Sequence, residues 1–155
     1  MSLELASAAF ESGGTIPALY TCEREDASPP LAWRGVPREA RSLVLICDDP
    51  DSTNGPWSHW VLYGIPTDRD DLGENVPLEG RLSWGGIQRR NDFGNPGYGG
   101  PCPSPPGSTH HYHFRLYALD KPLNLLPGAT RQQVLERTRG HILEQTKLMG
   151  LYTRS

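Results

Sequence analysis

The sequence has no long apolar run and no concentration of positive charge. Nowhere do 18 consecutive apolar residues occur, and the N-terminal stretch MSLELASAAFESGG has neither a basic start nor an apolar core. Neither a transmembrane segment nor a signal peptide is therefore expected, which makes the cytoplasm the default location. The 15 Lys and Arg residues are scattered among 18 Asp and Glu, for a net charge of -3. This pattern argues against a nucleic-acid partner.

Cysteine is scarce, and its spacing matches no zinc or redox motif. Cys47 occurs in the middle of an apolar run, so we expect it to be buried and inert. Cys22 and Cys102 both lie in predicted loops, where they could pair. Because the count is odd and a cytoplasmic protein is expected, we predict two free thiols instead.

Glycine and proline are abundant, at 17 and 15 of 155 residues, and are spread between apolar segments. This arrangement is typical of many short strands joined by turns, within a single domain over residues 1–155. Residues 67–108 show almost no periodic apolar pattern, and a loop of that length is usually functional. Strands are predicted at Leu3 to Phe10, Leu31 to Trp33, Ser42 to Cys47, Trp57 to Gly64 and His110 to Ala118.

The last of these strands begins with histidines, in HHYHFRLYALD. Side chains alternate across a strand, so His110 shares the apolar, core-facing side with Tyr112. His111 and His113 share the other side, where we expect them to be solvated. A histidine on the core face at the start of a strand indicates a polar position at the edge of the core.

A second histidine leads the strand that follows Asp48-Asp49-Pro50-Asp51. Strict alternation places His59 on one face with Trp57, Val61 and Tyr63. Asp49 ends the preceding strand, so an antiparallel hairpin would bring its carboxylate to the same rim as His59. Each feature has an ordinary interpretation, because Asp is common in turns and a single histidine commonly serves the core or surface. Two histidines that each lead an apolar strand favour a binding pocket.

The segments DDPDSTNGPWSHWVLYGIP and GGPCPSPPGSTHHYHFRLYALD contain D-P-D, W-x-H-W, Y-G-G-P and H-x-Y in order. Supporting stretches are IPALYTCEREDASPPLAWRGVP, QRRNDFGNPGYGG and GHILEQTKLMGLYTR. Together, over nearly the whole chain, these motifs resemble the phosphatidylethanolamine-binding protein (PEBP) family, in particular its bacterial branch of Raf-kinase-inhibitor-like proteins.

The resemblance implies a mainly β fold in which a large antiparallel sheet packs against a smaller one. It also implies a short C-terminal helix and a small anion-binding pocket at one end. By position, the family's pocket acid falls on Asp49, its two histidines on His59 and His110, and its tyrosine on Tyr112.

The resemblance further gives Asp51 and Trp57 supporting roles and makes the loop over residues 97–101 close the pocket. Its ligand-binding positions are Gly99, Gly100 and Pro101. The family usually has His-Arg-Tyr where this chain has His-His-Tyr, a change that we expect to alter the surface only.

The C-terminal part allows two interpretations. Apolar periodicity alone predicts one helix over residues 130–149, with Thr130 as its N-cap. The resemblance implies a short helix that ends near Arg139, followed by a strand from His141 to Tyr152. We adopt the second, because Gly140 is a common stop after a helix.

Two imidazoles, a phenol and loop amides suit a small oxyanion, such as the phosphate of a phosphoethanolamine-like headgroup. We therefore expect a non-enzymatic binder with no cofactor and no metal; the resemblance adds a homodimer, and regulation of another protein is a further option for which the sequence identifies no partner. A kinase- or protease-inhibitor module is one alternative. A weak hydrolase is another, since Ser58 and Ser108 lie near histidines, although no G-x-S-x-G motif is present. A zinc site at Asp49, His59 and His110 is a third, although H-E-x-x-H is absent.

Overall fold

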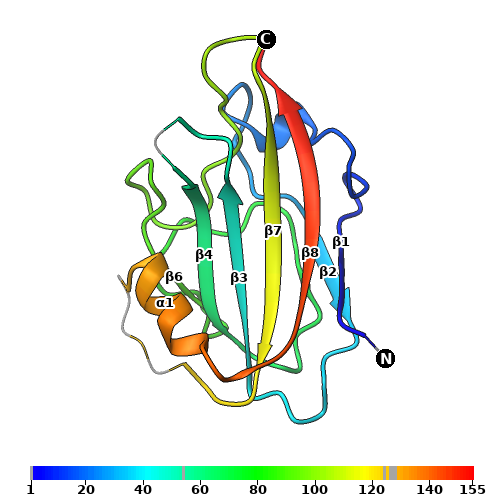
Figure 1. Cartoon of the computed structure of the whole chain (residues 1–155), viewed down its shortest axis with the longest axis vertical. Coiled ribbons are helices and arrows are strands. Elements are labelled where there is room, and N and C mark those ends of the chain that lie inside the picture. Colours follow the sequence, from blue (N-terminus) through cyan, green and yellow to red (C-terminus); the bar gives the residue numbers. More distant parts are fainter. Residues whose placement is uncertain (1, 54, 124, 126–128) are drawn as a thin grey trace.

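The computed structural model describes residues 2–53, 55–123, 125 and 129–155. Two antiparallel sheets pack together, as predicted (Figure 1). The larger has the order β6-β4-β3-β7-β8, formed by Ile87–Gln88, Trp57–Ile65, Ser42–Asp49, Thr109–Leu119 and Ile142–Thr153. The smaller has the order β1-β2-β5, formed by Glu4–Ala6, Leu31–Arg34 and Asp71–Leu72, and a single 3-10 turn covers Ala18–Tyr20.

The main core lies between the two sheets. β3 is the central strand of the larger sheet, and all eight of its residues are buried. Its inward-facing Leu43, Leu45 and Cys47 join one cluster with Phe114 of β7 and Trp33 of the smaller sheet. Each apolar side chain buried in this way contributes on the order of 1.5–3 kcal/mol, so the central strands hold the frame on which the loops are mounted.

A short helix, α1 (Arg131–Thr138), covers part of the opposite face of the larger sheet (Figure 1). Its Val134 is fully buried in a second cluster with Val44 of β3 and Val61 of β4. Thr130 caps it, because the Thr130 hydroxyl accepts from the Gln133 N–H and the Gln133 side chain accepts from the Thr130 N–H. No helix within the described ranges is long and apolar enough to cross a membrane.

The C-terminal prediction is confirmed in its shorter form. The helix ends at Thr138, and β8 begins at Ile142. Gly140 lies between them with a φ of +78°, a conformation that costs glycine little and other residues more.

Other predicted boundaries are wrong at the edges. β1 ends at Ala6 instead of Phe10, because the Ser7 hydroxyl donates to the Pro30 carbonyl and accepts from the Ala9 N–H. This local turn takes the chain out of the sheet. Residues 67–108 are not structureless: they contain β5 and β6, but two-residue strands are too short to leave a period in the sequence.

The prediction of two free thiols is wrong. Cys22 and Cys102 form a disulfide with their Cα atoms 5.4 Å apart, across 80 residues of sequence. Cys47 is free and buried, as predicted. The pair joins the loop after the 3-10 turn to the segment that precedes β7, two regions that no local sequence pattern connects.

Candidate functional site

The position of His59 depends on an irregularity in β4. Cys47 pairs with Trp60, and the next residue of β3, Asp48, pairs with Ser58, so His59 is an extra residue between them. Such a bulge locally breaks the alternation of side chains and commonly re-aims one of them near a functional site.

The predicted face of His59 is therefore wrong in one respect. Val61 and Tyr63 belong to the cluster under α1, whereas Trp60 belongs to the core between the sheets. The His59 ring instead meets Tyr112, on the inner side, with ring centroids 5.2 Å apart. The bulge thus turns His59 away from Val61 and Tyr63 and toward Tyr112.

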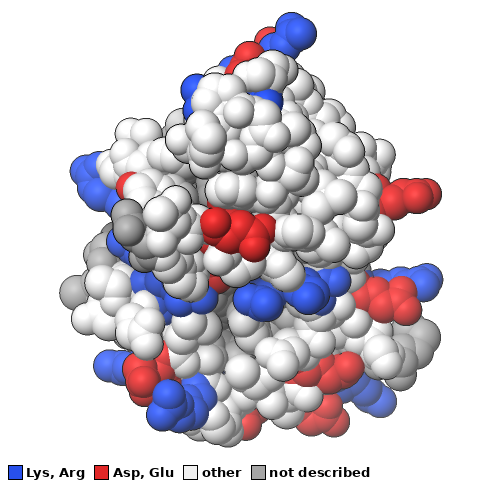
Figure 2. Space-filling view, turned by 45° about the horizontal axis from the view of Figure 1, so that its top comes forward, with Lys and Arg blue, Asp and Glu red and all other residues white. Residues whose placement is uncertain are grey.

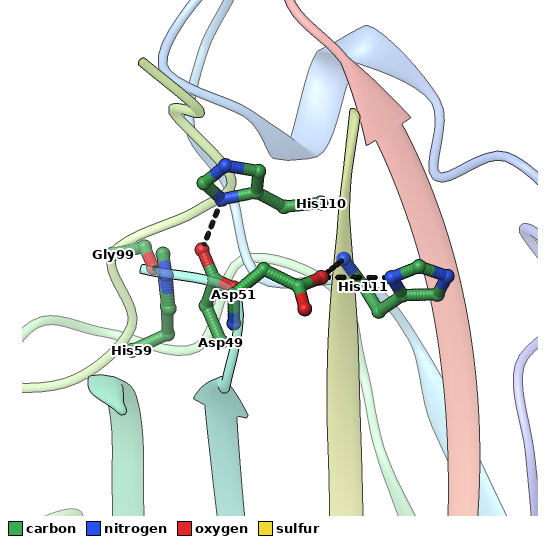
Figure 3. Close-up of polar contacts among 6 residues, drawn as sticks. All are labelled: Asp49, Asp51, His59, Gly99, His110 and His111. Atoms are coloured by element: carbon green, nitrogen blue, oxygen red, sulfur yellow. Dashed lines mark hydrogen bonds and ion pairs between the residues drawn. The ribbon is translucent and has the colours of Figure 1, made fainter. Parts of the chain in front are cut away.

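A pocket of about 190 Å³ opens where β3 ends and where β4 and β7 begin. The structure brings Asp49, Trp57, His59 and His110 together in its wall, as the sequence predicts. Figure 3 shows Asp49 pointing toward His110 and His59 directed to Gly99. The pocket is lined by Asp49, Ser52, Thr53, Trp57, His59, Phe93, Cys102, Ser104 and His110.

Asp49 orients His110. Its Oδ2 lies 2.6 Å from His110 Nδ1, and its Oδ1 accepts from the Asp51 N–H at 2.8 Å. Asp49 is only 4% exposed. A carboxylate accepts here, so Nδ1 carries the proton and Nε2 is left as the ring's other polar atom.

His59 is fixed in the same sense by the backbone. Its Nδ1 lies 2.5 Å from the Gly99 carbonyl oxygen, which can only accept, so Nδ1 donates. Burial lowers the pKa of His59, while the Gly99 carbonyl and then the Asp49 charge act in the opposite direction. The neutral ring is therefore favoured, with a lone pair on Nε2.

Two buried donors beside the pocket have no acceptor for their protons among the described residues: the Tyr112 hydroxyl and Trp57 Nε1. Tyr112 packs beneath both histidines, with its ring 6.5 Å from that of His110. Burial first, and the Asp49 charge second, hold the pKa of Tyr112 well above its ordinary value, although the Cys102 backbone acts to lower it. The Tyr112 phenol therefore stays protonated, next to His59 and His110, which line the pocket.

The glycine loop plays a different part from the one predicted. We expected its amides to face a ligand, but the Gly99 N–H donates to the His59 carbonyl and the Gly100 N–H donates to Asp26 Oδ1. Pro101 has no N–H, and its carbonyl accepts from the Cys22 N–H. Gly99, Gly100 and Pro101 do not line the pocket themselves; the loop orients His59, and the amides of Gly97, Gly99 and Gly100 are already engaged.

The loop is also clamped from behind. Tyr98 donates its hydroxyl proton to the Tyr20 carbonyl at 2.7 Å, and the Cys22–Cys102 disulfide joins the same two segments. A Cβ on Gly100 would lie 2.2 Å from the Tyr20 carbonyl oxygen, so no larger residue fits there without movement. This close approach explains why the loop carries glycine at that point.

Asp51 and the outward-facing histidines lie outside the pocket. Asp51 accepts from both the backbone N–H and Nδ1 of His111, so it is tied to the start of β7, and its predicted support of the pocket loop stays a prediction (Figure 3). His111 is exposed, as predicted, but His113 is half-buried rather than solvated.

Sequence reasoning did not identify five lining residues: Ser52, Thr53, Phe93, Cys102 and Ser104. Phe93 makes edge-on contacts with both Trp57 and His59 while remaining 45% exposed, so it forms an apolar rim. It lies in the motif QRRNDFGNPGYGG, where an aromatic residue between turn formers was the available signal. Within the described ranges, no three His, Cys, Asp or Glu side chains stand close enough to hold one metal ion.

The sequence is similar to known proteins over nearly its whole length. Residues 6–153 match the model of the family described as phosphatidylethanolamine-binding protein. A relative from Methanothermobacter thermautotrophicus, named UPF0098 protein, is 54% identical over 98% of this chain and 99% of its own. Another UPF0098 protein, from Aquifex aeolicus, is 44% identical over 98% of this chain and 89% of its own.

Two solved structures are similar over the whole chain. A PEBP homologue from Chlamydia trachomatis has a TM-score of 0.89 and 39% identity, with 99% of both chains covered. Escherichia coli YbcL, described as a member of the mammalian PEBP family, has a TM-score of 0.89 and 28% identity, with both chains fully covered.

Proposed function

The chain belongs to the phosphatidylethanolamine-binding protein family, and on that premise we propose that its pocket binds a small phosphorylated or otherwise anionic ligand. The observation that carries the proposal is the pair of buried donors without partners, Tyr112 Oη and Trp57 Nε1, beside two histidines whose Nδ1 atoms are already engaged. Buried donors are normally satisfied, so two unsatisfied ones, on the pocket-lining Trp57 and on Tyr112 behind the lining histidines, favour an acceptor-rich ligand.

The size of the pocket limits the ligand. A volume of about 190 Å³ holds a phosphoryl group with a short substituent, and the substituent would contact the exposed edge of Phe93. The amides of Gly97, Gly99 and Gly100 are engaged elsewhere, so the glycine loop leaves the ligand's oxygens to other donors around the pocket.

The protonation state of His59 sets a further requirement. A neutral Nε2 presents a lone pair, which repels a fully ionised oxyanion. The ligand must therefore carry a proton, as a phosphomonoester monoanion or an ammonium group does, or must draw a proton onto His59 when it binds. A phosphomonoester monoanion and proton uptake by His59 both favour binding at lower pH, whereas an ammonium group is protonated throughout this range.

A non-enzymatic role fits the serines near the pocket. Ser58 lies directly opposite Asp48, whose carboxylate is held by Arg131 on the face that carries α1, so the Ser58 hydroxyl shares that face and does not face His59 as an activated nucleophile would. A regulated protein partner, a homodimer and a cytoplasmic location stay predictions from sequence and resemblance.

The test is calorimetric titration with phosphoethanolamine. His59→Ala and His110→Ala each remove a polar group of the pocket, and loss of one charge-assisted hydrogen bond corresponds to a roughly 10- to 150-fold weaker affinity. His141→Ala is the matched control, because His141 Nδ1 also lies 2.8 Å from a carboxylate, Asp120, but at the other end of β7. Equal affinity in all four proteins would refute the site.

A further inference from the structure

The outer face of β7 and β8 is built from side-chain pairs that lie close together. The Met149 carbonyl and the Leu151 N–H form hydrogen bonds with the N-terminal segment that lies on the side of β8 away from β7. Odd-numbered residues of β8 therefore direct their backbone groups away from β7. Arg115–Lys147 and Tyr117–Gln145 are therefore non-hydrogen-bonded pairs in the β7–β8 register, the kind with side chains closest together.

These two pairs surround a hollow of about 350 Å³. Arg115 and Tyr117 line it from β7, Gln145 and Lys147 line it from β8, and Thr146 completes the lining. Helix α1 lies over the other half of this sheet, against β4, so the hollow is open (Figure 1). Figure 2 shows Lys and Arg side chains gathered across the middle of the molecule in a view of this side.

The two cations have no counter-ion among the described residues. Neither Arg115 nor Lys147 forms an ion pair or side-chain hydrogen bond within those ranges, and like charges placed opposite each other on a sheet are destabilising. Asp48, a carboxylate on the same face, is already held by Arg131, whose Nε lies 3.0 Å from both of its oxygens. The electropositive field also reaches His113, since Lys147 and Arg115 add to burial in lowering its pKa.

Protection of a sheet edge explains only half of this arrangement. β8 is the last strand of its sheet, and a lysine on an edge strand discourages pairing with other chains. Arg115 lies on β7, which is paired on both sides, and serves no such purpose. A second cation next to Lys147 needs another reason.

We propose that this hollow is a second anion site, which binds a dianionic oxyanion of the phosphoryl or sulfo type between Arg115 and Lys147. Two full positive charges match a dianion, whereas one carboxylate would leave a cation unbalanced. The guanidinium, the ammonium, the Tyr117 hydroxyl and the Gln145 amide all line this hollow and offer several donors, which suits a tetrahedral group with several acceptor oxygens. The site lies on the outer face midway along β7, separate from the pocket at the start of that strand.

The test is residue-resolved NMR titration of the ¹⁵N-labelled protein with sulfate, which does not titrate near neutral pH. We expect saturable shifts at the amides of Arg115, Gln145 and Lys147, which persist in His59→Gln/His110→Gln, a variant that disables the pocket. Arg115→Gln and Lys147→Gln should each weaken this binding about three- to tenfold, a modest change because the site is open to solvent and salt. Arg38→Gln is the charge-matched control; Arg38 is exposed and lies between β2 and β3, so its loss should change nothing.

Three outcomes would overturn the proposal: no saturable shifts at these amides, equal weakening by Arg38→Gln, or acetate binding as tightly as sulfate. Comparison of inorganic phosphate with a phosphomonoester then identifies the source of the group. Tighter binding of the ester indicates an organic phosphate whose carrier contacts Tyr117 or Gln145, and equal binding indicates the free ion.

Discussion

Replacing Tyr112 by phenylalanine removes one hydroxyl from a fully buried side chain and leaves its ring contacts with His59 and His110 in place. A buried polar group without a partner costs about 1–3 kcal/mol, so the substitution should leave the ligand-free protein equally stable or up to about 1 kcal/mol more stable. For a chain of this length, 1 kcal/mol corresponds to a melting temperature about 2–4 °C higher. The same change should weaken phosphate binding about 10- to 150-fold, because a hydrogen bond to a charged group is lost.

Tyr98→Phe is the matched control. The Tyr98 hydroxyl is also buried but donates to the Tyr20 carbonyl at 2.7 Å, so its loss should destabilise the protein by about 1 kcal/mol. Urea denaturation with and without phosphoethanolamine, together with calorimetric titration, separates the two effects. If Tyr112→Phe loses more than about 1 kcal/mol without ligand and keeps full affinity, the hydroxyl is a structural group and the reasoning fails.

Two further predictions concern charge. Burial lowers the pKa of His59, so this histidine binds a proton more readily in the unfolded chain than in the folded one. The ligand-free protein should therefore lose stability as pH falls through about 6.5. Sulfate affinity at the pocket should rise over the same range. Denaturation and pocket-amide NMR titration between pH 5 and 8 check this, and an unchanged pH profile in His59→Gln would contradict it. Arg131→Met should cost about 2–4 kcal/mol in urea denaturation, since it leaves the 3% exposed Asp48 unpaired. The double variant Asp48→Asn/Arg131→Met should recover most of that lost stability, and Arg137→Met, at an exposed position, should cost almost nothing. If Arg131→Met alone lowers the free energy of unfolding by less than about 1 kcal/mol, Asp48 does not behave as a buried unpaired charge.

The long strands were predictable because their apolar patterns are strong. The prediction of Ser42 to Cys47 fell within β3, and that of His110 to Ala118 fell within β7, because both strands carry enough apolar residues to show their direction of burial. The two-residue β5 and β6 were not predictable, since their pairing depends on neighbours supplied by the fold. The prediction of two free thiols failed for a related reason. An odd cysteine count says nothing about two loops that the Tyr98–Tyr20 contact brings together, where Cys22 and Cys102 form the disulfide.

The candidate site was predictable in its acid, its two histidines and Trp57, but not in the rest of its lining or in its chemistry. Asp49, His59 and His110 do meet, but the sequence gives no sign that Asp49 bonds to His110 rather than to His59. The glycine loop was expected to bind the ligand through its amides, yet these are engaged by His59 and Asp26. Such assignments depend on atom positions to within about 1 Å, which residue types and their spacing do not encode.

The bulge at His59 also has a consequence for how this protein can be changed. On one side of it, Trp60 keeps the register of the core; on the other, Trp57 and the turn that precedes it face the pocket. A residue added or removed in the turn before Trp57 would reset the pocket end of β4 without shifting the partners of Trp60. The extra residue therefore separates a fixed core register from the pocket end of β4, so loop grafting before Trp57 is the natural route to altered ligand selectivity on this scaffold.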